Sequence, residues 1–250
     1  MAGRGIKDFG PTPASAGRWL RTKSGQDPVR HADFPKSSFL VAGDGETMPR
    51  HEVVVLIPES TRKRSGGDPT RKEEDSIMAT LPAGLRDRLL DLRKQLLSRT
   101  GGKGVDAVGL MPAYERFDGN MYRRIEPSAW AGRTAGVEVL IVSALRGLLG
   151  SRDTVPRYSH SMAEAMPPLG KLNAWWRERG LPDVLRGFLA AVRPRSVVDL
   201  LSLEYRDAVE GYREGLEGVS VRAIDFPGMG RASQPERGRL VSKILRSGGP

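Results

Sequence analysis

Residues 139–176 read VLIVSALRGLLGSRDTVPRYSHSMAEAMPPLGKLNAWW, and this stretch decides the fold. Its apolar, β-branched start predicts an interior strand that ends at Ser143 and is covered on both faces. A Gly-rich turn is expected next, followed by a loop that carries Arg157, Tyr158 and His160. A buried strand that delivers polar side chains into a loop is typical of ligand sites in α/β proteins.

The rest of the chain supplies further strands and helices in alternation. Strands are expected over 53–57, which is apolar throughout, and over 137–142 and 197–201, which are mostly apolar. A fourth is expected over 219–224, whose alternating polarity is typical of a sheet edge. Helices are expected over 85–96, 173–179, 183–192 and 236–245. This pattern predicts an α/β or mixed α+β fold in one compact domain over 49–250.

Residues 1–48 differ from the rest, because they are rich in Gly, Pro and Ser and show little hydrophobic periodicity. Such a segment buries too little apolar surface to offset the entropy lost on ordering. We therefore expect a flexible basic extension. Met48 offers an alternative start of the chain, just before the first strong strand.

The composition limits the classes of function. The 250 residues carry a net charge of +10, which favours polyanionic partners such as duplex DNA or phosphate-bearing small molecules, although an arginine-rich bacterial proteome gives the same bias. The absence of cysteine excludes disulfides and thiolate chemistry, and three scattered histidines give no zinc signature, so we expect no metal and no cofactor. The sequence shows no transmembrane run and no secretory signal, which indicates a cytoplasmic protein; it leaves the oligomeric state open.

The first candidate site follows the strand at 53–57. Glu59 and Ser60 come directly after it, where ligands bind in open α/β sheets, and Lys63 belongs to a basic cluster that can clamp a phosphate. A solvated loop is the alternative. The spacing of Gly and Lys excludes a Walker A motif.

A second candidate combines Arg116 and Tyr122 around a glycine that permits a tight turn. Packing of the aromatic side chains in the core, at a connection between helices, is the alternative. His160 can serve as a base or be a hydrogen-bonded loop residue. Trp175 can stack on a nucleic-acid base, but adjacent helical residues face different directions, so at least one of Trp175 and Trp176 is expected in the core.

Two further candidates lie closer to the C-terminus. Asp199 follows the strand that starts at 197, again at a strand-to-turn transition. Arg237 and Arg239 lie near the start of the last helix, where backbone N–H groups also favour anions. Solvated charge is the alternative for these arginines.

Seven motifs in this order make the chain resemble the peroxide stress protein YaaA family, in the form found in high-GC Gram-positive bacteria. The resemblance runs from about residue 53 to 245. The motifs are Pro58–Ser60 after the first strand, Arg116–Tyr122, Ser143–Gly147, Pro156–Met162, Leu172–Trp176, Asp199–Tyr205 and Gly238–Leu240.

The resemblance implies an unusual α/β fold with a central mixed sheet flanked by helices and a positively charged cleft. It also implies association with DNA, through an element similar to a helix-hairpin-helix, and a part in the oxidative-stress response. The chain departs from the family pattern at three places. Residues 61–64 replace a Gly-Lys pair, Ser159 and His160 replace an arginine after Tyr158, and residues 233–238 lack a lysine that the family tends to carry.

Two hypotheses of function follow. In the first, basic loops of a stress protein bind nucleic acid or a nucleotide. In the second, an enzyme acts on a nucleotide-like or nucleobase-like small molecule, with Glu59, Ser143, Tyr158 and Asp199 as candidate catalytic residues. An enzyme requires these side chains, together with Arg116, around one electropositive hollow, whereas DNA binding requires only a broad basic surface.

Overall fold

The computed structural model describes residues 51–102 and 104–250. The predicted extension at residues 1–48, including the start-site alternative at Met48, lies outside the described residues.

A mixed five-stranded sheet forms the centre of the fold. Its strands are β1 (Val53–Pro58), β3 (Val137–Ser143), β4 (Gly147–Gly150), β8 (Ser196–Asp199) and β9 (Ser220–Ala223). They lie in the order β4, β3, β1, β8 and β9, with all neighbours parallel except β4, which runs antiparallel to β3. The predicted α/β fold with a central mixed sheet is therefore confirmed.

The apolar run after Glu52 makes β1 the middle strand. Val54, Val55 and Ile57 are fully buried, and β1 pairs in register with β3 on one side and β8 on the other. Helices cover both of its faces, so there is no solvent-facing side for polar residues to occupy. At the predicted edge, β9 has no fully buried residue.

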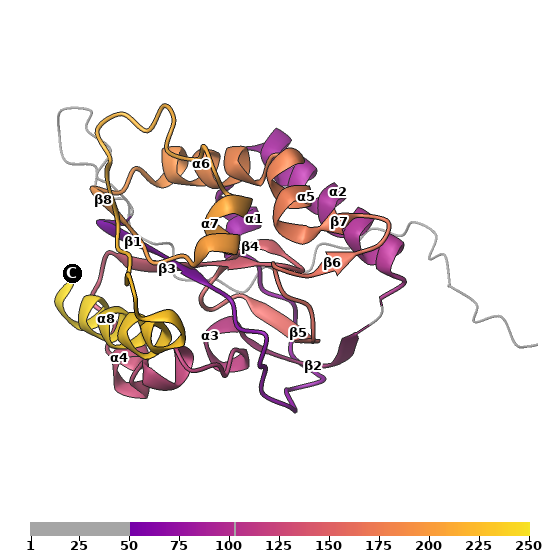
Figure 1. Cartoon of the computed structure of the whole chain (residues 1–250), viewed down its shortest axis with the longest axis horizontal. Helices are drawn as coiled ribbons and strands as arrows, with labels where there is room; N and C mark the ends of the chain where they lie inside the picture. Colours follow the sequence, from indigo (N-terminus) through magenta and orange to yellow (C-terminus); the bar gives the residue numbers. More distant parts are fainter. Residues whose placement is uncertain (1–50, 103) are drawn as a thin grey trace, which may run out of the picture. The chain divides into compact units, whose positions relative to one another are not determined.

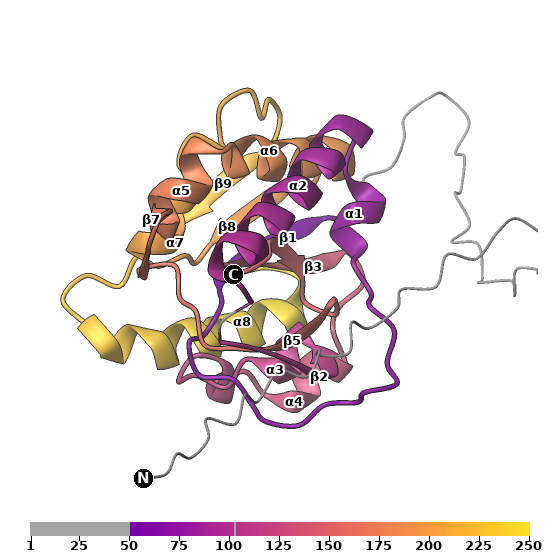
Figure 2. The same ribbon diagram turned by 90° about the vertical axis from the view of Figure 1, so that its right-hand side faces the viewer.

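The helices form two layers with the sheet between them (Figures 1 and 2). One layer contains α1 (Ser76–Thr80), α2 (Ala83–Thr100), α5 (Leu172–Glu178), α6 (Leu181–Val192) and α7 (Leu203–Ala208). The other contains α3 (Ala113–Arg116), the 3-10 helix η1 (Tyr122–Arg124), α4 (Pro127–Ala131) and α8 (Ser233–Ser247). A short 3-10 helix, η2 (Gly230–Ala232), leads into α8.

Part of the loop expected after Ser143 is in fact a strand of a second, two-stranded sheet. Residues Thr154–Tyr158 form strand β5, which pairs antiparallel with β2 (Val105–Pro112), so Arg157 and Tyr158 lie on a strand. This strand pair was not predicted because the pairing register of β2 shifts between Asp106 and Met111, around Gly109. Gly109 has φ +81°, and a Cβ there would lie 2.8 Å from the backbone of Gly67.

The expected Gly-rich turn is also partly a strand. Leu148 and Leu149 of β4 are buried against β3 after a tight reversal of the chain. Gly147 makes this reversal possible, because its φ is +71° and a Cβ would lie 2.9 Å from the ring of Trp176. A small hairpin of β6 (Ala165–Met166) and β7 (Gly170–Lys171) then leads into α5.

Candidate active site at the carboxyl ends of β1, β3 and β5

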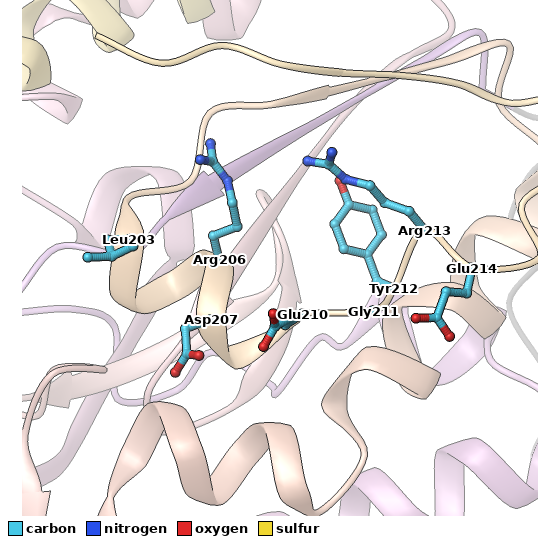
Figure 3. Close-up of a pocket in the computed structure, with 8 residues that line it drawn as sticks. All are labelled: Leu203, Arg206, Asp207, Glu210, Gly211, Tyr212, Arg213 and Glu214. Atoms are coloured by element: carbon cyan, nitrogen blue, oxygen red, sulfur yellow. The ribbon is translucent and has the colours of Figure 1, made fainter. Parts of the chain in front are cut away.

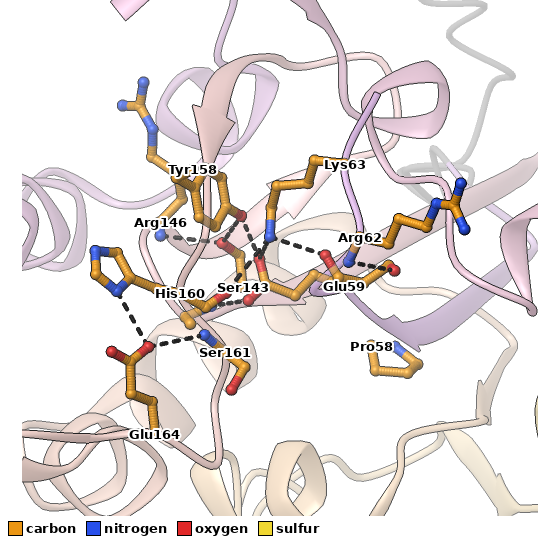
Figure 4. Close-up of polar contacts among 12 residues, drawn as sticks. Pro58, Glu59, Arg62, Lys63, Ser143, Arg146, Tyr158, His160, Ser161 and Glu164 are labelled. Carbon is orange, nitrogen blue, oxygen red and sulfur yellow. Dashed lines mark hydrogen bonds and ion pairs between the residues drawn. The ribbon is translucent and has the colours of Figure 1, made fainter. Parts of the chain in front are cut away.

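The parallel pairing of β1 and β3 places Glu59 beside Ser143. Pro58 pairs with Val142, so both polar residues leave the sheet at the same edge. Tyr158, the last residue of β5, reaches the same point from the second sheet. Three predicted catalytic residues from distant parts of the chain are thus in direct contact (Figure 4).

Hydrogen bonds connect Glu59, Tyr158 and Ser143 to one another and to the neighbouring backbone. The Glu59 carboxylate accepts the Ala144 N–H at 3.0 Å and the hydroxyl of Tyr158. The oxygens of Tyr158 and Ser143 lie 2.8 Å apart, and the Ser143 hydroxyl also accepts the Arg146 N–H at 3.1 Å. Because Tyr158 donates to Glu59, Ser143 donates to Tyr158, which gives a directed chain from Ser143 through Tyr158 to Glu59.

Lys63 completes the cluster from the loop after β1. Its Nζ lies 3.9 Å from Glu59 Oε2, and both side chains are almost completely buried. The ammonium donates to the backbone carbonyls of Ser60 at 2.8 Å and His160 at 3.4 Å, and it lies 3.8 Å from the ring centre of Tyr158. Below, "the Glu59 network" means Glu59, Lys63, Ser143 and Tyr158.

Burial shifts the proton affinities of the network toward neutral groups. It raises the pKa of Glu59, although Lys63 and the hydrogen bond from Tyr158 act in the opposite direction. Burial likewise lowers the pKa of Lys63 against the attraction of Glu59. Burial and the charge of Glu59 hold the pKa of Tyr158 well above its ordinary value. Because burial opposes the ionised forms of both groups, Glu59 is a candidate for taking up or releasing a proton.

A pocket of about 640 Å³ gives access to this network. It is lined by Thr61, Arg62, Lys63, Gly104, Val105, Asp106, Arg157, Tyr158 and Ser159. Arg62 and Arg157 are exposed, whereas Lys63 and Tyr158 are buried at its inner side. We call it the network pocket. The electropositive cleft that the family resemblance implies stays a prediction.

Three further predicted residues lie beside the network. Tyr122 is buried and donates its hydroxyl to the carbonyl of Pro58 at 2.9 Å. His160 is buried, and its Nδ1 lies 3.1 Å from Glu164 Oε2. Ser60 lies at the turn itself, where its hydroxyl accepts the Arg62 N–H at 3.2 Å.

Arg116 lies behind the pocket loop, and its guanidinium is completely buried. It donates to backbone carbonyls of residues 64, 66 and 109, at 2.6, 2.9 and 2.8 Å. These contacts hold the basic loop after β1 against β2. A contact of Arg116 with a ligand stays a prediction.

Both tryptophans are buried, in agreement with the expectation that at least one of them packs in the core. Trp175 packs edge-on against Trp176 with their ring centres 4.9 Å apart. Trp176 donates its indole N–H to the carbonyl of Ala144 at 2.8 Å, which fixes the turn after Ser143.

Asp199 forms a different cluster from Glu59. Its carboxylate accepts the Leu201 N–H at 3.0 Å, the Tyr212 hydroxyl at 3.2 Å and the Arg213 guanidinium at 2.7 Å. Arg206 Nε lies 3.5 Å away. These contacts tie the end of β8 to the segment after α7, so the geometry fits a buried anchor, and a catalytic role for Asp199 stays a prediction.

The arginines bound to Asp199 line a separate pocket of about 430 Å³ (Figure 3). In Figure 3, Arg206 and Arg213 extend to one side, and Asp207, Glu210 and Glu214 extend to the other. The mixture of charges gives this pocket no preference for anions.

Of the two predicted arginines of α8, Arg237 lies close enough to Arg206 and Asp199 for their charges to act on it. Arg237 donates to the Ser233 hydroxyl at 2.7 Å and lies 5.0 Å from the ring centre of Phe226. Arg239 is exposed and forms an ion pair with Glu236 of its own helix. Anion binding by these two residues stays a prediction.

Tyr205 ends the motif Asp199–Tyr205 but was not singled out as a candidate residue. Burial and the charge of Glu59 hold its pKa well above the ordinary value, which places its hydroxyl near the network. Its position at the start of the helix after β8, at the same sheet edge, is the signal that could have found it.

No helix within residues 51–102 or 104–250 is long and apolar enough to cross a membrane. Nor does this part of the chain gather three or more His, Asp or Glu side chains that could hold a metal ion.

Comparison with known proteins gives a consistent result. The sequence profile of the family "peroxide stress protein YaaA" matches residues 72–234, a span that contains Ser143, Tyr158 and Asp199 but begins after Lys63. A UPF0246 protein of Ruegeria sp. (strain TM1040) is 29% identical over 186 residues, which is 70% of this chain and 71% of the relative. A UPF0246 protein of Streptomyces coelicolor is 28% identical over 227 residues, covering 78% of this chain and 84% of the relative.

Proposed function

Because the chain belongs to the peroxide stress protein YaaA family, we propose that it acts in the cytoplasm on a phosphate-bearing, nucleotide-like or nucleobase-like small molecule. The ligand binds in the network pocket, and the Glu59 network moves a proton to or from it. The family name suggests a relation to peroxide stress, and the network pocket supplies the site for the chemistry.

The observation that carries the proposal is the convergence of four polar side chains under a single pocket. Glu59, Ser143 and Tyr158 come from three different strand ends, and Lys63 from the loop after one of them. A purely structural core rarely keeps a carboxylate and an ammonium almost completely buried, because each loses its hydration. Buried ionisable groups with shifted pKa values beside a pocket are typical of active sites.

The charges around the pocket suit an anion. Arg62 and Arg157 are exposed at its rim and can bind phosphate oxygens through charge-assisted hydrogen bonds. A ligand held there by its phosphate extends its other end toward Lys63 and Tyr158. Asp106 also lines the pocket, and a carboxylate is a hydrogen-bond acceptor.

Proton transfer would use the directed hydrogen-bond chain. Tyr158 takes a proton from an atom of the ligand while its own proton passes to Glu59, which leaves the ligand one proton poorer and Glu59 neutral. The Ser143 hydroxyl holds Tyr158 in place, and the Ala144 N–H fixes the second oxygen of Glu59. The reverse transfer protonates a leaving atom, such as the nitrogen of a departing base.

Thermal shift with a panel of nucleotides, nucleobases and inorganic phosphate tests this proposal. We expect one class of nucleotide to raise the melting temperature of the wild type and of a Lys94→Glu control, whose exposed side chain lies on α2. Arg157→Glu, with the same change of charge, should remove the shift. A panel without any stabilising compound, or equal shifts in both variants, would count against the proposal.

Duplex DNA is the second candidate ligand, and the net charge of +10 favours it. Electrophoretic mobility measured at several salt concentrations tests it, because affinity from phosphate contacts falls steeply with salt. Retardation at low salt that weakens in Arg157→Glu would place DNA at the network pocket. Unchanged mobility with excess protein at low salt would reject DNA binding.

A further inference from the structure

A third pocket, of about 220 Å³, lies apart from the Glu59 network. It is lined by Arg71, Glu74, Pro112, Tyr114, Trp130, Ala131, Arg133 and Arg152. Arg133 precedes β3, whereas Ser143 ends it, so the two pockets lie toward opposite ends of the same strand. Neither hypothesis drawn from the sequence used any of these lining residues.

Two aromatic rings form the apolar part of this pocket. Tyr114 of α3 and Trp130 of α4 pack with ring centres 5.1 Å apart and planes tilted by 36°. Both side chains are half-buried, so each keeps part of its surface open to a ligand. Such a pair offers a planar ring contact area at little entropic cost, because each side chain has only two rotatable bonds.

Arginines provide the charge. Arg71 and Arg152 are exposed, and both lie close enough to Tyr114 for their charges to lower the pKa of its hydroxyl, which burial and the neighbouring Glu115 carboxylate raise. Arg133 is held in place by Glu138 at 3.1 Å. Glu74 is the single acidic residue in the lining, so cationic groups outnumber it.

The backbone holds this arrangement firmly. Tyr114 donates its N–H to the carbonyl of Ser151 at 2.9 Å, and Ala113 donates to that of Asp153 at 2.8 Å. The Asp153 carboxylate in turn accepts the N–H groups of Gly150 and Ser76, at 2.7 and 2.8 Å. Arg152 is thereby carried by a turn that is fixed on both sides, and the site is preorganised.

We propose that this pocket, the Tyr114–Trp130 pocket, binds a small aromatic anion, namely a planar ring that bears one carboxylate or phosphate group. The ring packs against Trp130 and Tyr114, and the anionic group binds Arg152 and Arg71. A volume of about 220 Å³ fits a single ring better than a whole nucleotide, which separates this ligand from that of the network pocket.

Titration with salicylate, phenyl phosphate and inorganic phosphate tests the proposal, read by calorimetry and by tryptophan fluorescence. We expect saturable binding of the aromatic probes at concentrations at least tenfold lower than for inorganic phosphate. Arg152→Glu should weaken this binding at least tenfold, and Trp130→Phe should remove the fluorescence change. Lys94→Glu, whose exposed side chain lies outside both pockets, should leave both readouts unchanged.

Three outcomes would overturn the proposal. One is the absence of saturable binding by the wild type at millimolar probe, and another is undiminished binding by a folded Arg152→Glu protein. The third is equal affinity for inorganic phosphate, which would mean a simple anion site without ring recognition. Arg152 is exposed, so its replacement should preserve the circular dichroism spectrum and keep the comparison valid.

Discussion

Replacing Lys63 by Met should destabilise the protein strongly at neutral pH and much less in acid. The change keeps the apolar stem but removes the cation that faces Glu59 at 3.9 Å. Both side chains are almost completely buried, so water cannot replace the lost partner. Glu59 would then be a buried carboxylate without a countercharge.

The size of the effect follows from that geometry. Two unit charges 3.9 Å apart attract each other by about 4 kcal/mol at an effective dielectric constant of about 20. Removal of one partner of a buried pair typically costs about 3–5 kcal/mol, which agrees. We therefore expect Lys63→Met to lower the free energy of unfolding by about 3–5 kcal/mol near pH 8.

The sign of the pH dependence comes from Glu59. Its pKa in the folded protein is already raised by burial, and loss of Lys63 raises it further. A raised carboxyl pKa means that the folded state binds the proton more tightly, so its contribution to stability is fully present below the unfolded pKa and is lost as pH rises through the folded pKa. The deficit of the variant should accordingly shrink as pH falls toward 4.5, the ordinary value for Glu.

Urea unfolding at several pH values, for the wild type, Lys63→Met and the double variant Lys63→Met/Glu59→Gln, measures this. The double variant removes the isolated charge, so at pH 8 it should be more stable than Lys63→Met alone. A deficit of Lys63→Met that is independent of pH would refute the reasoning. So would a double variant less stable than Lys63→Met at pH 8.

Further predictions concern the parts that position the site. Arg116→Met should lower the free energy of unfolding by about 3 kcal/mol or more in urea unfolding, since it leaves several buried carbonyls without donors; a loss below about 1 kcal/mol would contradict this. Gly147→Ala should cost about 1–3 kcal/mol, because φ is +71° and the new Cβ meets Trp176, and an unchanged melting temperature would argue otherwise. Asp199→Asn should destabilise the protein by more than Tyr212→Phe does, as measured by thermal melting, because it weakens two arginine contacts as well as one hydroxyl contact.

The sequence predicted the centre of the fold well, because continuous apolar runs permit few arrangements. The run 53–57 became the middle strand, and the polar residues after it and after the strand at 137–142 met at one edge, as parallel pairing requires. Glu59 and Ser143 could therefore be predicted from the sequence to lie side by side.

The remaining features depend on contacts that local pattern does not encode. Strand β5 contains Pro156 and Arg157 and pairs with a strand that is interrupted at Gly109, so neither reads as a strand alone. The direction of the Asp199 side chain is set by Arg213, in a segment with little hydrophobic periodicity. The contact of Lys63 with Glu59 depends on how the loop after β1 turns back, and Arg116, from a distant element, fixes that loop.

Carbon-13 NMR titration of the Glu59 side-chain carboxyl tests most directly whether a buried proton-sharing network underlies the network pocket. We predict a midpoint clearly above 4.5 in the wild type and a still higher one in Tyr158→Phe, which loses the hydroxyl that stabilises the ionised carboxylate. A midpoint at or below 4.5 that Tyr158→Phe leaves unchanged would contradict the account.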